Sequence, residues 1–356
     1  MPEMAGYKGL TRLEVIRKLN AQREWVNQGL YKLLLDKDMS VLAYERMKSK
    51  PGNMTPGTDG DTLDGFSTAQ IEKLIVTMRD ESYQCKPVRT TYIPKSNGKL
   101  RKLGIPSTRD KLVQEVVMLI LEAVYDSPEG PYFLENSHGF RSSKSCHSAL
   151  REIQRKWSGV SWFLEGDIAS CFDDIDHEIL VKLIERKVSD QRFINLIWKI
   201  LKAGYMDLDG TRRDSLAGTP QGGIASPILA NIYLPVKRKD KLIKIVFYRN
   251  TDWTIKRDAF TDEPEVDRVR MNVRLRTRSK PGYPCCICGE TEGIEMHHVR
   301  HVRKMDGSKS QGFTRVMGIM NRKQVPVCSA CHKKIHRGEY DGLRLKDQAY
   351  DPRKPL

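Results

Sequence analysis

Cysteine and histidine residues cluster near the C-terminal end of the chain, and this cluster constrains the fold more than any other feature. Five of the eight cysteines and five of the eight histidines lie within residues 285–336. Cys285 and Cys288 form one CxxC pair, and Cys328 and Cys331 form a second pair about forty residues later. Such a spacing is typical of a tetrahedral zinc site, because a two-residue spacer lets both thiolates reach one ion. We predict a structural Zn²⁺ bound by these four cysteines.

Four histidines of the same segment fit a second metal site. His332 and His336 are four residues apart, so on a helix they share one face and can bind one ion. His297 and His298 are adjacent in a segment, 294–300, that alternates like a strand, so their side chains should point to opposite sides. One can then bind metal while the other activates water. The alternative is a second zinc site without chemistry.

At this point the segment resembles the HNH nucleases, which have a ββα-metal fold. The resemblance implies that His297 joins the helical histidine pair around a catalytic divalent ion, with Mg²⁺ expected, and that His298 is the general base. The Asn of the family motif should come just before the second CxxC pair. This chain has Gln324 there and Asn321 three residues earlier, and either can orient the loop.

Positive charge is concentrated in the last third of the chain. The 356 residues carry a net charge of +16; from Lys237 onward 28 Lys and Arg face 15 Asp and Glu, a net of +13, which leaves +3 for the first 236 residues. Such a charge favours a polyanion, most simply a nucleic-acid backbone, over a merely soluble basic surface. We expect no membrane span and no signal peptide. Clustered thiols fit a reducing compartment, either a bacterial cytoplasm or an organelle.

The first 236 residues show the patterns of a mixed helix and strand domain. Apolar spacing predicts helices within 10–35, over 71–79, 109–125 and 145–156, and within 178–203. A hairpin is expected from a strand at 88–94, a turn at 95–99 and a returning strand at 103–106. A strand should end at Asp167, and a glycine-rich loop at 218–223 should precede a further helix.

In this order these segments resemble the fingers and the first half of the palm of group II intron reverse transcriptases. The resemblance covers about residues 50 to 234 and implies that Asp167 is a catalytic carboxylate that binds Mg²⁺. The motifs that carry it are Thr58-Asp-Gly, Tyr92-Ile-Pro-Lys, Leu103-Gly-Ile-Pro, His138-Gly-Phe-Arg, Asp167-Ile-Ala-Ser-Cys-Phe, Gly218-Thr-Pro-Gln-Gly-Gly and Leu229-Ala-Asn-Ile-Tyr.

The Tyr-x-Asp-Asp motif of that family does not occur in this sequence. Its aspartates would join Asp167 around two metal ions, and the only adjacent aspartates, Asp173 and Asp174, lie in the first palm segment. About fifty residues separate Tyr233 from the first zinc cysteine, too few for the rest of the palm and a thumb. We therefore expect Asp167 alone to bind metal poorly and the chain to be inactive as a polymerase. An open palm edge is also expected where the missing hairpin would pair.

The predicted fold class is α+β, a partial right-hand polymerase with fingers and half a palm, followed by a small zinc-stabilised ββα-metal domain. The expected divisions are an N-terminal helical region at 1–50, reverse transcriptase fingers and partial palm at 51–236, a basic DNA-binding linker at 237–282, the HNH endonuclease at 283–340 and a tail at 341–356. Predicted nucleic-acid contacts are Lys95, Arg101, Arg141, Lys144, Gln221, Gly222, Arg274, Arg276 and Arg278.

Three functional hypotheses follow. The first is a group II intron protein whose working enzyme is an HNH endonuclease that nicks one DNA strand. The second is an intron RNA-binding factor for splicing or mobility with a vestigial nuclease. The third is a reverse transcriptase completed in trans by a separate chain. The expected partners are target DNA and group II intron RNA, and the oligomeric state stays open.

Overall fold

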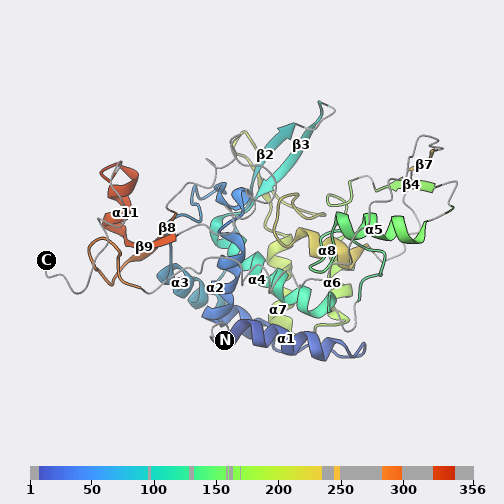
Figure 1. The fold of residues 1–356 in the computed structure, drawn as a ribbon, viewed down its shortest axis with the longest axis horizontal. Helices are drawn as coiled ribbons and strands as arrows, with labels where there is room; N and C mark the ends of the chain where they lie inside the picture. Colours follow the sequence, from blue (N-terminus) through green and yellow to red (C-terminus); the bar gives the residue numbers. More distant parts are fainter. Residues whose placement is uncertain are drawn as a thin grey trace.

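The computed structural model describes residues 8–94, 98–127, 132–157, 159, 163–168, 170–234, 244–248, 283–298 and 324–340. In Figure 1 a mostly helical body fills the centre, a small unit of two strands and a helix lies at one end of the long axis, and a pair of strands lies toward the other. Five predicted site residues lie outside the described ranges: Lys95, Arg274, Arg276, Arg278 and Asn321.

The helical body is built around α4. Fifteen of the eighteen residues of this helix are buried, so it is covered on all sides rather than on one stripe. The α-helices are α1 (Lys8–Asn20), α2 (Lys37–Met47), α3 (Thr68–Arg79), α4 (Thr108–Tyr125), α5 (Cys146–Lys156), α6 (His177–Glu185), α7 (Gln191–Leu201) and α8 (Ser226–Tyr233), and the 3-10 helices are η1 (Leu30–Leu35) and η2 (Pro51–Met54).

Three small sheets surround this body. The first has the order β3-β2-β5-β6 and contains β2 (Val88–Pro94), β3 (Leu100–Ile105), β5 (Tyr205–Met206) and β6 (Arg212–Arg213). In the second, β4 (Phe163–Asp167) pairs antiparallel with β7 (Lys244–Tyr248). The third has the order β1-β8-β9, from β1 (Phe66–Ser67), β8 (Ile294–His298) and β9 (Gln324–Cys328), and α11 (Ser329–His336) follows it.

The third sheet joins segments that are more than two hundred residues apart in the sequence. β8 and β9 pair antiparallel, with His298 opposite Gln324 and Ile294 opposite Cys328. On its other edge β8 pairs antiparallel with β1, with Phe66 opposite Met296. A strand of the N-terminal body therefore extends the sheet of the ββα unit, and the two regions form one sheet.

Most of the predicted elements are present, and the mixed helix and strand class is confirmed at that level. Several elements were not predicted: α2, β7 and the short η2, β1, β5 and β6. α2 starts at Lys37, where the Asp36 carboxylate caps the helix by accepting from the Asp38 N–H. β7 lies inside the segment 237–282 that we expected to be a linker, and its backbone pairs with β4 along the edge that we expected to be open. No described helix has the length and apolarity that a bilayer crossing requires.

A buried ion-pair network fixes α2 to α4. The Arg46 guanidinium lies 3.0 Å from a carboxylate oxygen of Glu115 and 3.0 Å from one of Glu122, and all three side chains are almost fully covered. Charges in such an interior are stable only while they are paired. Arg46 therefore holds α2 in place by compensating two buried carboxylates of α4.

Replacing Arg46 should destabilise the helical body strongly. We expect Arg46→Leu to lower the free energy of unfolding by about 3–5 kcal/mol, because it leaves two buried carboxylates without a cation. Urea unfolding followed by circular dichroism measures this loss. The matched control is Lys182→Leu, which removes the exposed Lys182–Glu178 pair and should change stability little. Equal losses in the two variants would contradict this role of Arg46.

Candidate metal centres

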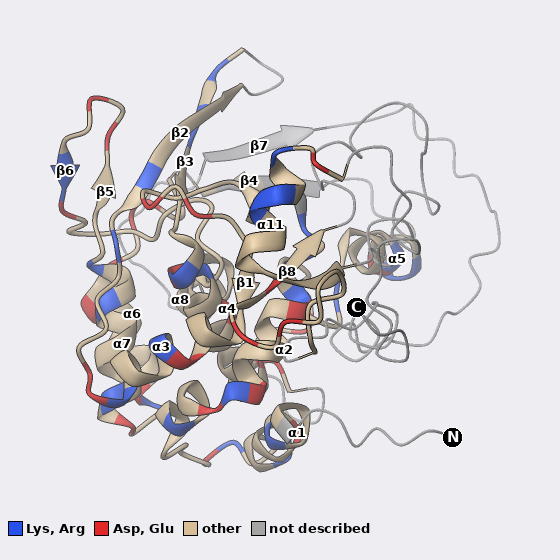
Figure 2. Cartoon of the chain, turned by 90° about the vertical axis from the view of Figure 1, so that its left-hand side faces the viewer, with Lys and Arg blue, Asp and Glu red and all other residues tan. Residues whose placement is uncertain are grey.

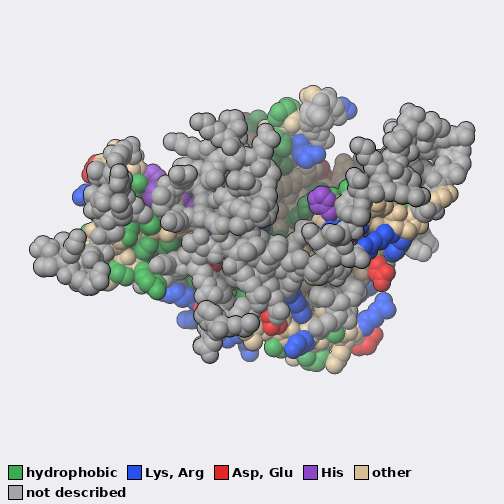
Figure 3. Space-filling view, viewed as in Figure 1, with side chains coloured by type: hydrophobic (Ala, Val, Ile, Leu, Met, Phe, Trp, Pro, Cys, Tyr) green, Lys and Arg blue, Asp and Glu red, His purple; other side chains and the backbone are tan. Residues whose placement is uncertain are grey.

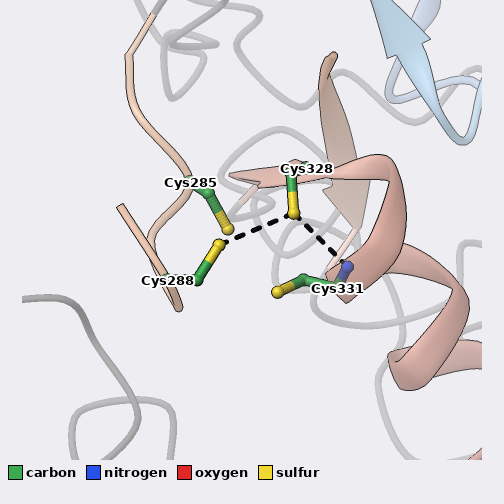
Figure 4. Close-up of side chains that lie close together, drawn as sticks. All are labelled: Cys285, Cys288, Cys328 and Cys331. Atoms are coloured by element: carbon green, nitrogen blue, oxygen red, sulfur yellow. Dashed lines mark hydrogen bonds between the residues drawn. The ribbon is translucent and has the colours of Figure 1, made fainter. Parts of the chain in front are cut away.

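The four predicted zinc cysteines come together in the structure. Cys285 and Cys288 lie in a turn before β8, whereas Cys328 ends β9 and Cys331 lies in the first turn of α11; Figure 4 shows the four side chains facing one centre. Their sulfur atoms all lie within 4.8 Å of one another, and the Cys288 and Cys328 sulfurs are 3.6 Å apart. Zinc–sulfur bonds of about 2.3 Å in a tetrahedron require about 3.8 Å between sulfurs, so the set fits Zn²⁺.

The surroundings of Cys285 favour its thiolate, whereas burial raises the pKa of the Cys288 and Cys331 thiols. Burial opposes ionisation of the Cys285 thiol, but nearby backbone N–H groups, including that of Cys288, lower its pKa to about 7. The neighbouring Cys286 is not part of the cluster, and burial raises the pKa of its thiol to about 11. A thiolate is the form that binds zinc, so Cys285 is prepared for the role that Cys286 is not.

Three histidines and one carboxylate form a second cluster. His297 lies on β8 and His332 and His336 lie one turn apart on α11, as predicted, and the fourth member is Asp64, which directly precedes Gly65 and β1. One ligand atom from each of the four lies within 4.8 Å of the others. Histidine side chains are visible on the surface at this end of the molecule in Figure 3.

The distances and the donor atoms of this second cluster fit a divalent ion. The Nε2 atoms of His332 and His336 are 3.1 Å apart, and Asp64 Oδ2 lies 3.7 Å and 3.2 Å from them. Metal–nitrogen bonds of about 2.0–2.1 Å in a tetrahedron place ligand atoms about 3.4 Å apart. His297 Nδ1 is buried, has no hydrogen-bond partner and lies 3.8 Å from Asp64 Oδ1. A buried ring nitrogen that has no hydrogen-bond partner and lies beside a carboxylate is typical of a metal ligand.

A second carboxylate orients His332. Glu295 lies on β8, two residues before His297, and its Oε2 pairs with Nδ1 of His332. The other ring nitrogen of His332 then faces the cluster, an arrangement that is usual for metal-binding histidines. Gly65 makes room for this pair: its φ is +79°, and a Cβ atom there would come within 3.2 Å of the His332 ring and 3.3 Å of Glu295.

The cluster places the neutral imidazole of His297 beside the ionised carboxylate of Asp64. Burial lowers the pKa of His297 to about 4, so this ring is neutral near pH 7. Burial would raise the pKa of Asp64, but hydrogen bonds from His298 and His332 hold it well below its usual value. For His332 burial acts to lower the pKa, but Asp64 and Glu295 together raise it. A cation is therefore favoured at this position.

His298, the predicted general base, faces away from His297 and is buried. Its backbone N–H donates to Asp64 Oδ1, and its Nδ1 lies 3.4 Å from the same oxygen. Its Nε2 lies 2.9 Å from the Gln324 amide nitrogen and 3.2 Å from the Lys48 carbonyl oxygen. Gln324 in turn donates to the Tyr44 hydroxyl at 2.6 Å. Gln324 therefore contacts the predicted base directly, while α2 covers both residues.

Several predicted nucleic-acid contacts have partners within the chain. The buried Arg141 guanidinium pairs with Asp126 at 2.7 Å and donates to two backbone carbonyls, so it stabilises its own loop. Lys144 donates to the Glu135 carbonyl. Arg101 is exposed on β3, and Figure 2 shows basic residues on this hairpin and on α11. Of Asp167 only the backbone is described, at the end of β4 opposite Lys244.

The glycine-rich loop packs against its own chain. Gly218 has a φ of +82°, and a Cβ atom there would lie 2.5 Å from the carbonyl oxygen of Asp173. At Gly222, with a φ of +110°, a Cβ atom would lie 2.8 Å from the Gly104 carbonyl, while Gln221 accepts from the Gly104 N–H at 2.7 Å. We predicted Gln221 and Gly222 as nucleic-acid contacts, and in the structure the backbone that approaches Gly218 and Gly222 is the protein's own.

Two stretches of the chain match known protein families. Residues 93–242 match the family described as reverse transcriptase (RNA-dependent DNA polymerase). Residues 285–332 match the family described as AI2M/AI1M-like, HNH endonuclease. The second match begins at Cys285 and ends at His332, so it contains all four clustered cysteines and two of the four members of the second cluster, His297 and His332. The resemblance to both families that the motifs indicated is confirmed.

Proteins encoded by group II introns are among the similar sequences. The group II intron-encoded protein LtrA of Lactococcus lactis subsp. cremoris is 48% identical over 247 residues, 69% of this chain and 40% of that protein. An uncharacterized 91 kDa protein in a cob intron of Schizosaccharomyces pombe is 49% identical over 59% of this chain and 25% of that protein. Protein YkfC of Escherichia coli is 38% identical over 58% and 55%. The chain thus spans from a quarter to about half of these relatives.

Among solved structures, a partial Cas6-RT-Cas1–Cas2 complex shares 20% identity with a TM-score of 0.39, over 59% of this chain and 34% of that one.

Loss of zinc should unfold the ββα unit and leave the helical body intact. We expect Cys328→Ser, or treatment with a strong chelator, to abolish protection of residues 283–298 and 324–340 in hydrogen exchange, because metal binding supplies the folding energy of such small units. Peptides from α4 should keep their protection. Cys286→Ser is the matched control and should behave like the unchanged protein. Protected 283–298 peptides in Cys328→Ser would refute the zinc assignment.

Proposed function

Since this chain joins a reverse transcriptase segment to an AI2M/AI1M-like HNH endonuclease segment and is similar to group II intron-encoded proteins, we propose that it is a metal-dependent DNA endonuclease that nicks one strand. The observation that carries the proposal is the histidine cluster, in which His297, His332 and His336 from a ββα unit converge on one point. The Nδ1 atom of His297 is buried there and has no hydrogen-bond partner. The proposed partners are target DNA and group II intron RNA, in a bacterial cytoplasm or an organelle.

In this proposal the three histidines hold the ion and Glu295 keeps the His332 ring in its binding orientation. When bound, the ion would neutralise charge on the scissile phosphate and on the leaving oxygen. Imidazole ligands suit Zn²⁺, Co²⁺ or Ni²⁺ better than the Mg²⁺ that we expected, because Mg²⁺ favours oxygen ligands. The cysteine cluster takes the structural Zn²⁺.

His298 is the proposed base that takes a proton from the attacking water. Donation from Nδ1 to Asp64 and acceptance from the Gln324 amide would leave the lone pair of the ring on Nε2, whereas the Lys48 carbonyl beside this atom can only accept a hydrogen bond. Gln324 thus contacts the proposed base directly. In the sequence it stands just before the second CxxC pair, where the family motif has its asparagine. Because Nε2 also faces the Lys48 carbonyl, α2 has to move away from β8 before water reaches this atom.

The cysteine cluster, the three clustered histidines and the basic end of α11 lie in one unit, and this arrangement supports strand cleavage by the chain. The polymerase-like half differs from this unit, because its sequence lacks most of the metal-binding carboxylates that its reaction needs. Only Asp167 remains of the expected carboxylates, and a two-metal site needs several oxygen ligands that converge on ions about 4 Å apart. We propose that this half binds nucleic acid and does not polymerise by itself.

Removal of the base should stop nicking. We expect His298→Ala to slow the conversion of supercoiled plasmid to open circles in Ni²⁺ at least about 100-fold, since general-base catalysis contributes about 10²–10⁴-fold. The variant should still bind the ion, because the three ligating histidines remain. His147→Ala, which changes an exposed histidine on α5, is the matched control and should nick at the normal rate. Undiminished nicking by His298→Ala would remove His298 from the mechanism.

The chain alone should not extend a primer. We expect no product from purified protein with a primed RNA template and Mg²⁺, because the two aspartates of the Tyr-x-Asp-Asp motif do not occur in the sequence. A full-length reverse transcriptase in the same assay is the positive control. Extension by this chain that Asp167→Ala abolishes would overturn this part of the proposal.

A further inference from the structure

The HNH segment does not contain all four members of the histidine cluster. Its three histidines come from β8 and α11, whereas Asp64 comes from the loop before β1, more than two hundred residues earlier in the chain. We propose that Asp64 is a protein ligand of the nuclease metal, so that the ion is bound jointly by the HNH unit and the fingers. This inference rests on the proposed function, because it concerns the same ion.

The position of Asp64 is built by contacts along a strand. Gly65 donates its N–H to the Met296 carbonyl at 3.4 Å, and Phe66 and Ser67 continue the pairing with β8. These contacts hold the chain beside β8 just before His297. The Asp64 side chain is 11% exposed, so its carboxylate is directed into the cluster rather than into solvent.

Both carboxylate oxygens of Asp64 are used. Oδ1 accepts from the His298 backbone N–H at 3.3 Å and lies 3.8 Å from the orphaned His297 Nδ1. Oδ2 lies 3.2 Å from His336 Nε2 and 3.7 Å from His332 Nε2. An ion placed between the three rings would therefore have a carboxylate oxygen within reach, and the donor set becomes three nitrogens and one oxygen.

The rest of the interface supports a specific docking at this place. The Tyr44 ring on α2 stacks on Phe66 with ring centres 4.0 Å apart, and its hydroxyl accepts from Gln324. Met296 of β8 belongs to the main apolar core of the helical body. Gly65 favours the close approach of its loop to the cluster, since a Cβ atom there would lie 3.2 Å from the His332 ring and 3.3 Å from Glu295. Asp64 is thus held by packing on both sides of the cluster.

A fourth protein ligand has a chemical consequence. Zinc-like ions with four protein ligands form closed sites, whereas catalytic sites keep one position for water or substrate. Substrate can then reach the ion by expansion of the shell or by departure of Asp64. Because binding free energies are reciprocal, an ion held by both regions also stabilises their docking.

A metal titration tests this inference without using nicking. The protein is first given one equivalent of Zn²⁺ to fill the cysteine cluster, and Co²⁺ is then added while its visible d–d absorption is followed. Asp64→Asn, which keeps the size of the side chain, should bind Co²⁺ at least about tenfold more weakly than the unchanged protein. Asp61→Asn, an exposed aspartate of the same loop, is the matched control and should bind normally.

Hydrogen exchange supplies a second readout. Co²⁺ should slow exchange in the peptide spanning residues 62–67 of the unchanged protein and should do so far less in Asp64→Asn. A Co²⁺ affinity in Asp64→Asn within about twofold of normal, or no metal-dependent protection of that peptide, would overturn the inference. His332→Ala separates this failure from that of the proposed function: if no Co²⁺ site sensitive to His332→Ala exists, the nuclease metal itself is absent.

Discussion

The histidine cluster depends on the four cysteines that tie the turn at 285–288 to the start of α11. Among the described residues of the unit, the small apolar cluster at its centre contains Ile294 and Val327 beside Cys285, Cys328 and Cys331. Metal binding supplies folding energy to small units of this kind, and we propose the same here. His297 on β8 and His332 on α11 are held at ligand distance because this knot fixes the strand and the helix to each other. The two clusters therefore share one structural unit, in which the cysteines hold the fold and the histidines form the proposed metal site.

The second constraint is α2, which contacts both halves of the molecule. One side of the helix carries Arg46 to the buried glutamates of α4, and another places Tyr44 and the Lys48 carbonyl against the ββα unit. The same helix thus helps to position the polymerase-like body and covers the proposed catalytic base. Any movement that exposes His298 has to break the Gln324–Tyr44 hydrogen bond or shift the Tyr44–Phe66 stack.

Local patterns predicted most elements and the two CxxC pairs that the structure brings together, because each element and each pair depends on residues close in sequence. The histidine set came from the family resemblance and did not include Asp64. The apolar stripe of α4 and the hairpin at 88–105 have short periods that a sequence shows directly. The residues that were missed act over long distances. Arg141 looked like a phosphate contact because its partner, Asp126, is fifteen residues away. Glu295 could have been found, since a carboxylate two residues from His297 on a strand shares its side of the sheet.

Asp64 could not have been found in this way, and the reason is physical. Its loop is rich in Gly and Asp and is locally typical of a connector, so nothing in its neighbours points to a metal. The signal is the pairing of β1 with β8, which joins segments more than two hundred residues apart and depends on how the whole body folds. From the sequence the nuclease looked like a separate site beside a damaged polymerase. In the structure Asp64 of the N-terminal body lies in the ligand cluster, so under our proposal occupancy of the ion and docking of that body are linked equilibria. At a free ion concentration 100 times the dissociation constant this linkage is worth about 2.7 kcal/mol, enough to shift the docking equilibrium about a hundredfold if only the docked form binds the ion. The fingers segment would then be kept in place by the nuclease it covers, whether or not the body around it can polymerise.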